Sequence, residues 1–115
     1  MANTFKTITK ANVTSADIIY TVAGSTTTVL LGILLGNTTG SAITATVSLG
    51  SDTANRAGNN DEANQTVELI TGTSIPANSS LELLTGNKVV METTDTLSVT
   101  ASASTDVVLS IMELT

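Results

Sequence analysis

The acidic side chains are the first residues of this sequence that could do chemistry. The chain holds ten carboxylates, and hydrolytic enzymes use such groups in pairs, one as general acid and one as general base. Here they stand singly along expected strands and turns, so no spacing brings two of them onto one substrate. We interpret them as solvated residues of strand faces. Those outside the longest polar interval are Asp17, Glu68, Glu82, Glu92, Asp95, Asp106 and Glu113.

Other catalytic groups are missing from the sequence or are poorly placed. There is no histidine and no cysteine, which excludes imidazole catalysis, thiolate chemistry, disulfides and zinc sites of the usual Cys/His kind. A serine or threonine nucleophile would then need a lysine as its base, and Lys6, Lys10 and Lys88 stand in no Ser-x-x-Lys arrangement. We therefore expect no enzymatic activity and no cofactor.

The longest polar interval, residues 50–65, contains no aliphatic residue larger than alanine. It cannot carry core packing, so we expect an exposed loop, and long loops in small domains are often functional. Its oxygen-bearing side chains could suit calcium, but the spacing of an EF-hand is missing. A plain hydrophilic loop is the preferred interpretation, and a calcium-dependent binding module stays an alternative. The candidate oxygen ligands are Asp52, Asn55, Asn59, Asn60, Asp61 and Glu62.

Charge and hydropathy narrow the classes of partner. The formal net charge is −6, with only four lysines and arginines in 115 residues, whereas nucleic-acid binding needs clustered cations. The apolar run of residues 29–35 is far shorter than the roughly 20 residues that span a bilayer, and the polar amino terminus has no signal-peptide pattern. We expect no nucleic-acid or membrane partner and a product made in the cytoplasm.

Residues 28–36, with the sequence TVLLGILLG, organise the expected fold. In an extended chain both sides of this stretch are apolar, which predicts a central strand that must be covered on both faces. Aromatic residues are Phe5 and Tyr20 alone, so the core must be aliphatic; we expect Tyr20 in the core with its hydroxyl reaching a turn. On one face of the stretch lie Val29, Leu31, Ile33 and Leu35, and on the other Leu30 and Leu34.

The rest of the chain alternates short strands with turns. Ile43, Ala45, Val47 and Leu49 alternate with threonine and serine, as in a strand with one wet face. The pattern predicts a single all-β domain, an antiparallel β-sandwich of jelly-roll type with about eight strands. Residues 1–12 form an amino-terminal arm or edge strand, and residues 13–115 form the sandwich with the polar loop at 50–65. Expected strands cover residues 4–10, 17–22, 28–36, 42–49, 66–71, 79–84, 88–92, 97–101 and 107–114.

Several stretches resemble small virion structural proteins of tailed, especially marine, bacteriophages. They are SADIIYTVAGSTTTV at residues 15–29, GILLGNTTG at 32–40 and ITATVSL at 43–49, together with the opening MANTFK and the closing VVLSIMEL. The sequence departs from that group at Ala23, where proline is common, and in the long 50–65 interval. The resemblance implies a β-sandwich that assembles on the phage particle, without telling which part of the particle.

Physics and resemblance lead to one functional hypothesis. An aliphatic sandwich with little charge suits docking of many copies on a lattice, where weak interfaces act together. We expect a capsid decoration (cement) protein on the outside of the head, bound to the major capsid protein and to itself as a trimer. A tail, neck or fibre-associated subunit and a non-viral surface-layer or pilus-like module are the alternatives. The expected contact residues are Thr4, Phe5, Lys6, Thr7 and Ile8 in the arm and Asn59, Asn60, Asp61 and Glu62 in the loop.

Overall fold

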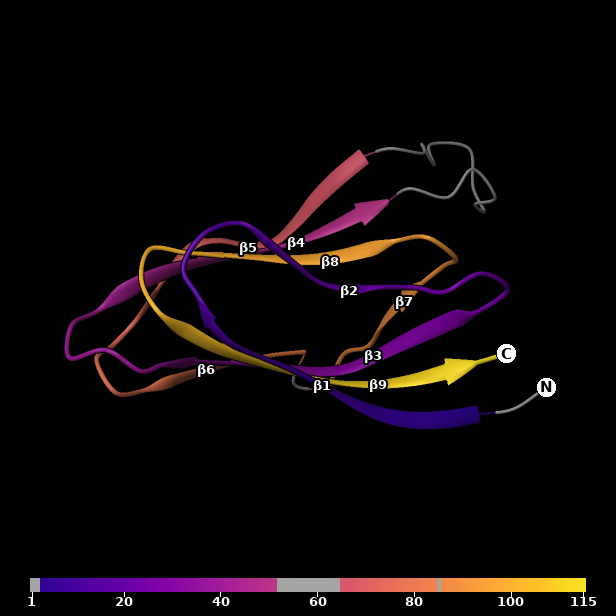
Figure 1. Ribbon diagram of the computed structural model, residues 1–115, viewed down its shortest axis with the longest axis horizontal. Coiled ribbons are helices and arrows are strands. Elements are labelled where there is room, and N and C mark those ends of the chain that lie inside the picture. The colour runs from indigo at the N-terminus through magenta and orange to yellow at the C-terminus, as the bar shows by residue number, and fades with distance from the viewer. Residues whose placement is uncertain (1–2, 52–64, 85) are drawn as a thin grey trace.

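The computed structural model describes residues 3–51, 65–84 and 86–115, and these residues form nine β-strands in two antiparallel sheets (Figure 1). The described residues include no helix. The all-β sandwich expected from the sequence is therefore confirmed. The strands are β1 (Asn3–Val13), β2 (Asp17–Thr21), β3 (Thr27–Asn37), β4 (Ile43–Ser51), β5 (Gln65–Ile75), β6 (Ser80–Leu83), β7 (Val89–Met91), β8 (Thr96–Ala101) and β9 (Thr105–Leu114).

The chain passes repeatedly from one sheet to the other. The first sheet, here called sheet A, has the order β1-β9-β3-β6, with β7 also paired to β3; the second, sheet B, has the order β2-β8-β4-β5. Figure 1 shows the two sheets nearly edge on, with sheet A below and sheet B above. This strand order is that of a jelly roll, whose two Greek keys use eight strands, and the three-residue β7 is an addition to it.

The core between the sheets is aliphatic, as expected from the scarcity of aromatic residues. Ile43, Ala45 and Val47 of β4 are buried in alternation, and their threonine and serine neighbours lie on the outer side, as the sequence pattern predicted. β8, beside β4 in sheet B, and β9, across the core in sheet A, bury alternate residues with the same period of two. Fully or nearly fully buried residues include Leu30, Leu35, Ile75, Met91, Leu97, Val99, Val107, Leu109 and Ile111.

β3 is the central strand of sheet A, but only one of its faces is covered. It pairs with β9 on one side and with β6 and β7 on the other. A register shift between Leu30 and Gly32 breaks the alternation, so Leu30 lies on the same, buried side as Ile33. The expected faces of this stretch were therefore wrong. Within residues 3–51, 65–84 and 86–115 no second layer covers the other side of β3, where Leu34 is 36% exposed.

Asn37 fixes the end of β3 against the turn between β5 and β6. The residue is only 3% exposed, and its Nδ2 donates to the carbonyl oxygens of Ser41, Ile75 and Pro76 at 2.8, 3.0 and 3.0 Å. Its Oδ1 accepts from the backbone N–H of Thr39 at 2.9 Å. One side chain thus joins two turns that lie far apart in the sequence, where the chain crosses from sheet B to sheet A.

Candidate functional site on the outer face of sheet A

The contact residues expected near the amino terminus lie in β1, the edge strand of sheet A. In the pairing of β1 with β9, Phe5 stands opposite Met112 and Lys6 opposite Ile111. Ile111 is buried in the core, so Lys6 is on the inner side of the sheet and Phe5 on the outer side. The five residues therefore separate by alternation. Thr4, Lys6 and Ile8 are on the inner side, and Phe5 and Thr7 on the outer side.

The other expected site residues lie outside the described residues. Asn59, Asn60, Asp61 and Glu62, with the remaining calcium-ligand candidates, fall within residues 52–64. Within the part of the chain that the structure describes, no three His, Cys, Asp or Glu side chains gather as a metal site would require. The described residues also contain no helix long and apolar enough to cross a membrane.

An apolar row crosses the outer face of sheet A near the chain termini. Phe5 pairs with Met112, Met112 with Val29, and Val29 with Val90, so four strands each place one apolar side chain on the same line. Phe5 is 72% exposed and Val90 is 58% exposed. Side chains of this size are seldom left in such contiguous rows on soluble monomers.

A second row, at the position in β9 four residues before Met112, borders a shallow hollow. Val108 lies opposite Leu34, and Leu34 lies opposite Glu82. Between the two rows stands the pair Ser110 and Gly32, whose small side chains leave space. The hollow measures about 400 Å³. Its lining includes Leu31, Gly32, Leu34, Glu82, Leu84, Gly86, Val108 and Ser110.

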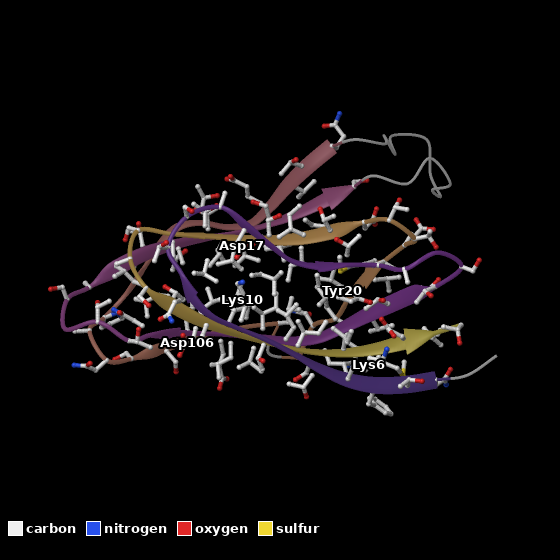
Figure 2. The ribbon with its side chains drawn as sticks, in the orientation of Figure 1. Lys6, Lys10, Asp17, Tyr20 and Asp106 are labelled. Atoms are coloured by element: carbon white, nitrogen blue, oxygen red, sulfur yellow. The ribbon has the colours of Figure 1, made fainter. Side chains whose placement is uncertain are left out.

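Little charge interrupts this face. Its strands contribute the carboxylates of Glu82 and Asp106, and Asp106 Oδ1 accepts from the backbone N–H of Asn12 at 3.0 Å. The strand lysines Lys6 and Lys10 are directed to the other side of β1, and Figure 2 shows Lys10 in the space between the sheets. The face can therefore exclude water over a broad area at a small cost in desolvated charge.

The outer face of sheet B has a different chemistry. Threonine and serine hydroxyls occupy the outward positions of β4 and β8, for example the paired Thr46 and Thr100 and the paired Ser48 and Ser98. Ile18 of the edge strand β2 lies on this face and is 60% exposed, and Val67 of the other edge strand, β5, is 52% exposed. The two faces of the sandwich thus differ, one apolar and one rich in hydroxyl groups.

A polar cluster joins the two sheets near the first apolar row. The Tyr20 hydroxyl of β2 donates to Glu113 Oε2 of β9 at 2.5 Å and accepts from Thr28 Oγ1 of β3 at 2.7 Å. Lys6 Nζ of β1 lies 2.7 Å from Glu113 Oε1. Figure 2 shows Tyr20 between the sheets. The expectation that this hydroxyl reaches a turn was wrong, because its partners belong to strands of sheet A.

The same contacts shift the ionisation of the two acidic groups. Desolvation, followed by the hydrogen bond to Glu113, raises the pKa of Tyr20 to about 12. The hydrogen bonds from Lys6 and Tyr20 hold the pKa of Glu113 below its ordinary value. At neutral pH Glu113 is a carboxylate and Tyr20 a neutral donor, so the cluster ties four strands together and offers neither a free base nor an activated nucleophile.

Comparison with known proteins gives few relatives. No family model matches the chain, and no curated protein matches it. Among solved structures, the chain is similar to a protein of Bacillus endospore appendages, described as a novel family of disulfide-linked pili. The sequence identity is 18%, the match covers 99% of this chain and 87% of that chain, and the TM-score is 0.47. This sequence contains no cysteine, so the disulfide linkage belongs to that protein.

Proposed function

We propose that this chain is a non-enzymatic structural protein that works in many copies, as a decoration (cement) protein on the outside of a tailed-phage capsid. The observation that carries the proposal is the outer face of sheet A, a broad apolar surface on a rigid sandwich. Contiguous apolar patches of this kind mark protein interfaces. A protein whose main surface feature is an uncovered sheet face is suited to binding neighbours.

The chemistry of the described residues supports a structural role over a catalytic one. In the polar cluster around Tyr20 and Glu113, the Glu113 carboxylate is paired with Lys6. The Tyr20 hydroxyl is hydrogen-bonded to both Glu113 and Thr28. A general acid or base needs a group that can reach a substrate and change its proton state near the working pH. The pKa of Tyr20 is raised to about 12 and the pKa of Glu113 is lowered, so neither acidic group of this cluster changes its proton state near neutral pH.

Placement on a phage particle rests on the sequence resemblance, and two further features agree with a position on the outside of the head. Jelly rolls are common among viral capsid proteins, although lectins and cupins share them. The net charge of −6 suits a surface that faces away from packaged DNA. Many weak contacts made by copies on one lattice would hold such a protein firmly on the shell.

The experiment is to locate the protein on particles of the phage that encodes it. Cryo-electron microscopy is expected to show a sandwich-sized density at regular positions on the outside of the head. Heads made without the protein are expected to release DNA at a lower temperature, and purified protein added back is expected to restore the wild-type temperature. Absence from the particle would refute the proposal, and density confined to the neck, tail or fibres would replace it with a tail-associated role.

A filament subunit of pilus-like type is the second candidate, favoured by the long edge strands. β1 and β5 each run for 11 residues at the edges of different sheets, and such edges can pair with strands of other chains. Negative-stain electron microscopy of the purified protein separates the two candidates. Regular filaments formed by this protein alone would favour the second candidate, and discrete particles the first.

A further inference from the structure

The outer face of sheet A carries both a protruding aromatic side chain and a hollow of suitable character. We propose that this face seats the same face of a second copy of the chain, with Phe5 of each copy in the hollow of the other. The inference deepens the proposed function, because it names the partner of this face, and it rests on that function only for the setting of a multi-copy assembly. The experiment distinguishes a failure of this pairing from a failure of the proposed function.

Phe5 and the hollow lie on different strands and in different rows of the same face. Phe5 lies on the edge strand β1, in the row of Met112, whereas the hollow lies over β3 and β6, in the rows of Ser110 and Val108. With strands about 4.8 Å apart and residues about 3.3 Å apart along a strand, the two features are separated by roughly 11 Å across the sheet and 10 Å along it. They therefore occupy diagonally opposite parts of one face.

That diagonal arrangement is what a two-fold contact requires. In an isologous pair, a feature at one place meets a different feature at the place related to it by the axis. A two-fold axis in the plane of the interface, at right angles to the line from Phe5 to the hollow and through its midpoint, brings both pairs into contact at once. The strands of the two copies then cross at a steep angle, as in the orthogonal class of sheet packing.

The midpoint itself is built from small residues. It falls at Ser110 and its cross-strand neighbour Gly32. Ser110 is exposed, and a Cβ atom at Gly32 would meet nothing within 4 Å. Large side chains at the axis would hold the two sheets apart. The small residues instead let the faces approach until Phe5 can reach Leu34 and Val108 in the hollow.

The crossing of the two sheets sets the area of the pair. Four strands about 4.8 Å apart and about 11 residues long present roughly 19 by 36 Å, and two such faces that cross near 90° overlap over roughly 19 by 19 Å, or about 360 Å² of flat face per copy. A standard stable interface buries about 800 Å² per partner, so this contact is of the small, weak class that many copies in one assembly hold together. Phe5, 72% exposed in one chain, would be the aromatic anchor of the kind that carries most of the binding energy in such interfaces.

Sedimentation equilibrium of the full chain tests the proposal. One chain has a mass of 11.7 kDa, and the mass of the wild-type protein is expected to rise toward twice that value as its concentration approaches about 1 mM, because the interface is small. Phe5→Ala is expected to weaken the pair at least about 10-fold in dissociation constant, as loss of an anchor does. Ser110→Lys, which sets two ammonium groups against each other at the axis, is expected to give monomers.

Matched variants on the other sheet are the controls. Ile18→Ala removes an apolar side chain of similar exposure, 60%, from the edge strand of sheet B, and Thr100→Lys adds a lysine to an exposed position of β8. Both are expected to leave the dissociation constant unchanged. Circular dichroism of every variant, compared with the wild type, reports whether the fold is kept, since all four positions are exposed.

Cross-linking gives a second readout that does not depend on weakening the pair. The sequence has no cysteine, so Ser110→Cys carries one thiol, expected to lie beside its copy at the axis and to be joined to it by a short bis-maleimide. Thr100→Cys is expected to stay uncross-linked. A monomeric or trimeric wild type, or equal effects of Phe5→Ala and Ile18→Ala, would overturn the proposal. A monomer that still decorates heads would leave the proposed function standing, and a dimer absent from particles would refute that function alone.

Discussion

The hydrogen bond between Tyr20 and Glu113 gives the sharpest prediction about stability. Tyr20→Phe deletes one hydroxyl and keeps the ring, so Glu113 loses a donor and Thr28 loses an acceptor. A hydrogen bond to a charged group contributes about 1.5–3 kcal/mol, and we reduce this to about 1–2 kcal/mol because Glu113 keeps Lys6 as a partner. Its carboxylate also remains 13% exposed to water.

The expected loss is measurable by thermal unfolding. A domain of this length has an unfolding entropy of about 240 cal/mol/K, so 1 kcal/mol lowers Tm by about 4 °C and the variant should melt about 4–8 °C below the wild type. Differential scanning calorimetry at pH 7 measures the shift. Thr100→Ala, at an exposed position of β8, is the control and should melt within about 2 °C of the wild type.

A double-mutant cycle shows whether the loss belongs to this pair. Glu113→Gln alone and in combination with Tyr20→Phe should give a coupling energy of about 1 kcal/mol, because the two side chains are in direct contact. A Tyr20→Phe protein that melts with the wild type, or two effects that simply add, would refute the reasoning that this cluster holds the sheets together.

The remaining predictions concern pH, packing and metal. Because the pKa of Glu113 is lowered in the fold, its contribution to stability is present above its unfolded value of about 4.3 and should be lost as the pH falls below it. Because the pKa of Tyr20 is raised to about 12, its contribution is present below pH of about 10 and should be lost between there and about 12; urea unfolding across both ranges measures the two losses. Leu30→Ala, at a fully buried position, should lower the free energy of unfolding by about 2–5 kcal/mol. Asn37→Ala should lower it by about 2–4 kcal/mol in the same assay, because the buried carbonyl of Ile75 and the partly buried backbone groups of Ser41 and Thr39 lose their partner. Calcium and a chelator should both leave Tm unchanged if residues 52–64 are a plain polar loop, whereas heat in a calcium titration would contradict that interpretation.

Strands in which apolar and polar residues alternate could be predicted from the sequence. The alternation through Ile43, Ala45 and Val47 determines which side of β4 faces the core, because only one register buries the apolar set. The Ile75-Pro-Ala-Asn turn also follows local rules, and Asn78 adopts φ of 56° as an asparagine can. Local signals of this kind depend on neighbours in the chain, which a single sequence contains.

Features that depend on distant pairing could not be predicted in the same way. The register shift between Leu30 and Gly32 arises from pairing with β9, about 80 residues later. β5 runs to Ile75, beyond the expected end at residue 71, because Gly72 with φ of 54° lets pairing with β4 continue. Tyr20 and Glu113 are 93 positions apart, and no local pattern joins them.

The apolar outer face did leave a signal in the sequence. Residues 107–112 read VVLSIM, so Val108 and Met112 are apolar on the side opposite to Val107 and Leu109. A strand with one wet face shows polar residues at those positions. Apolar residues on both faces of a strand indicate that both faces are covered. In the described chain, no second layer covers the outer face of β9. This pattern supports the proposal that another molecule supplies the second layer.

Hydroxyl-radical footprinting of the protein in its native assembly, read by mass spectrometry, tests the central claim that another protein covers the outer face of sheet A. Relative to the dilute, dissociated chain, Phe5, Met112 and Val90 should be strongly protected from oxidation, and Ile18 on sheet B should serve as the reference. Equal oxidation of Phe5, Met112 and Val90 in the two states would show that the apolar face stays open to water, and the account of this protein as an assembly subunit bound through sheet A would be wrong.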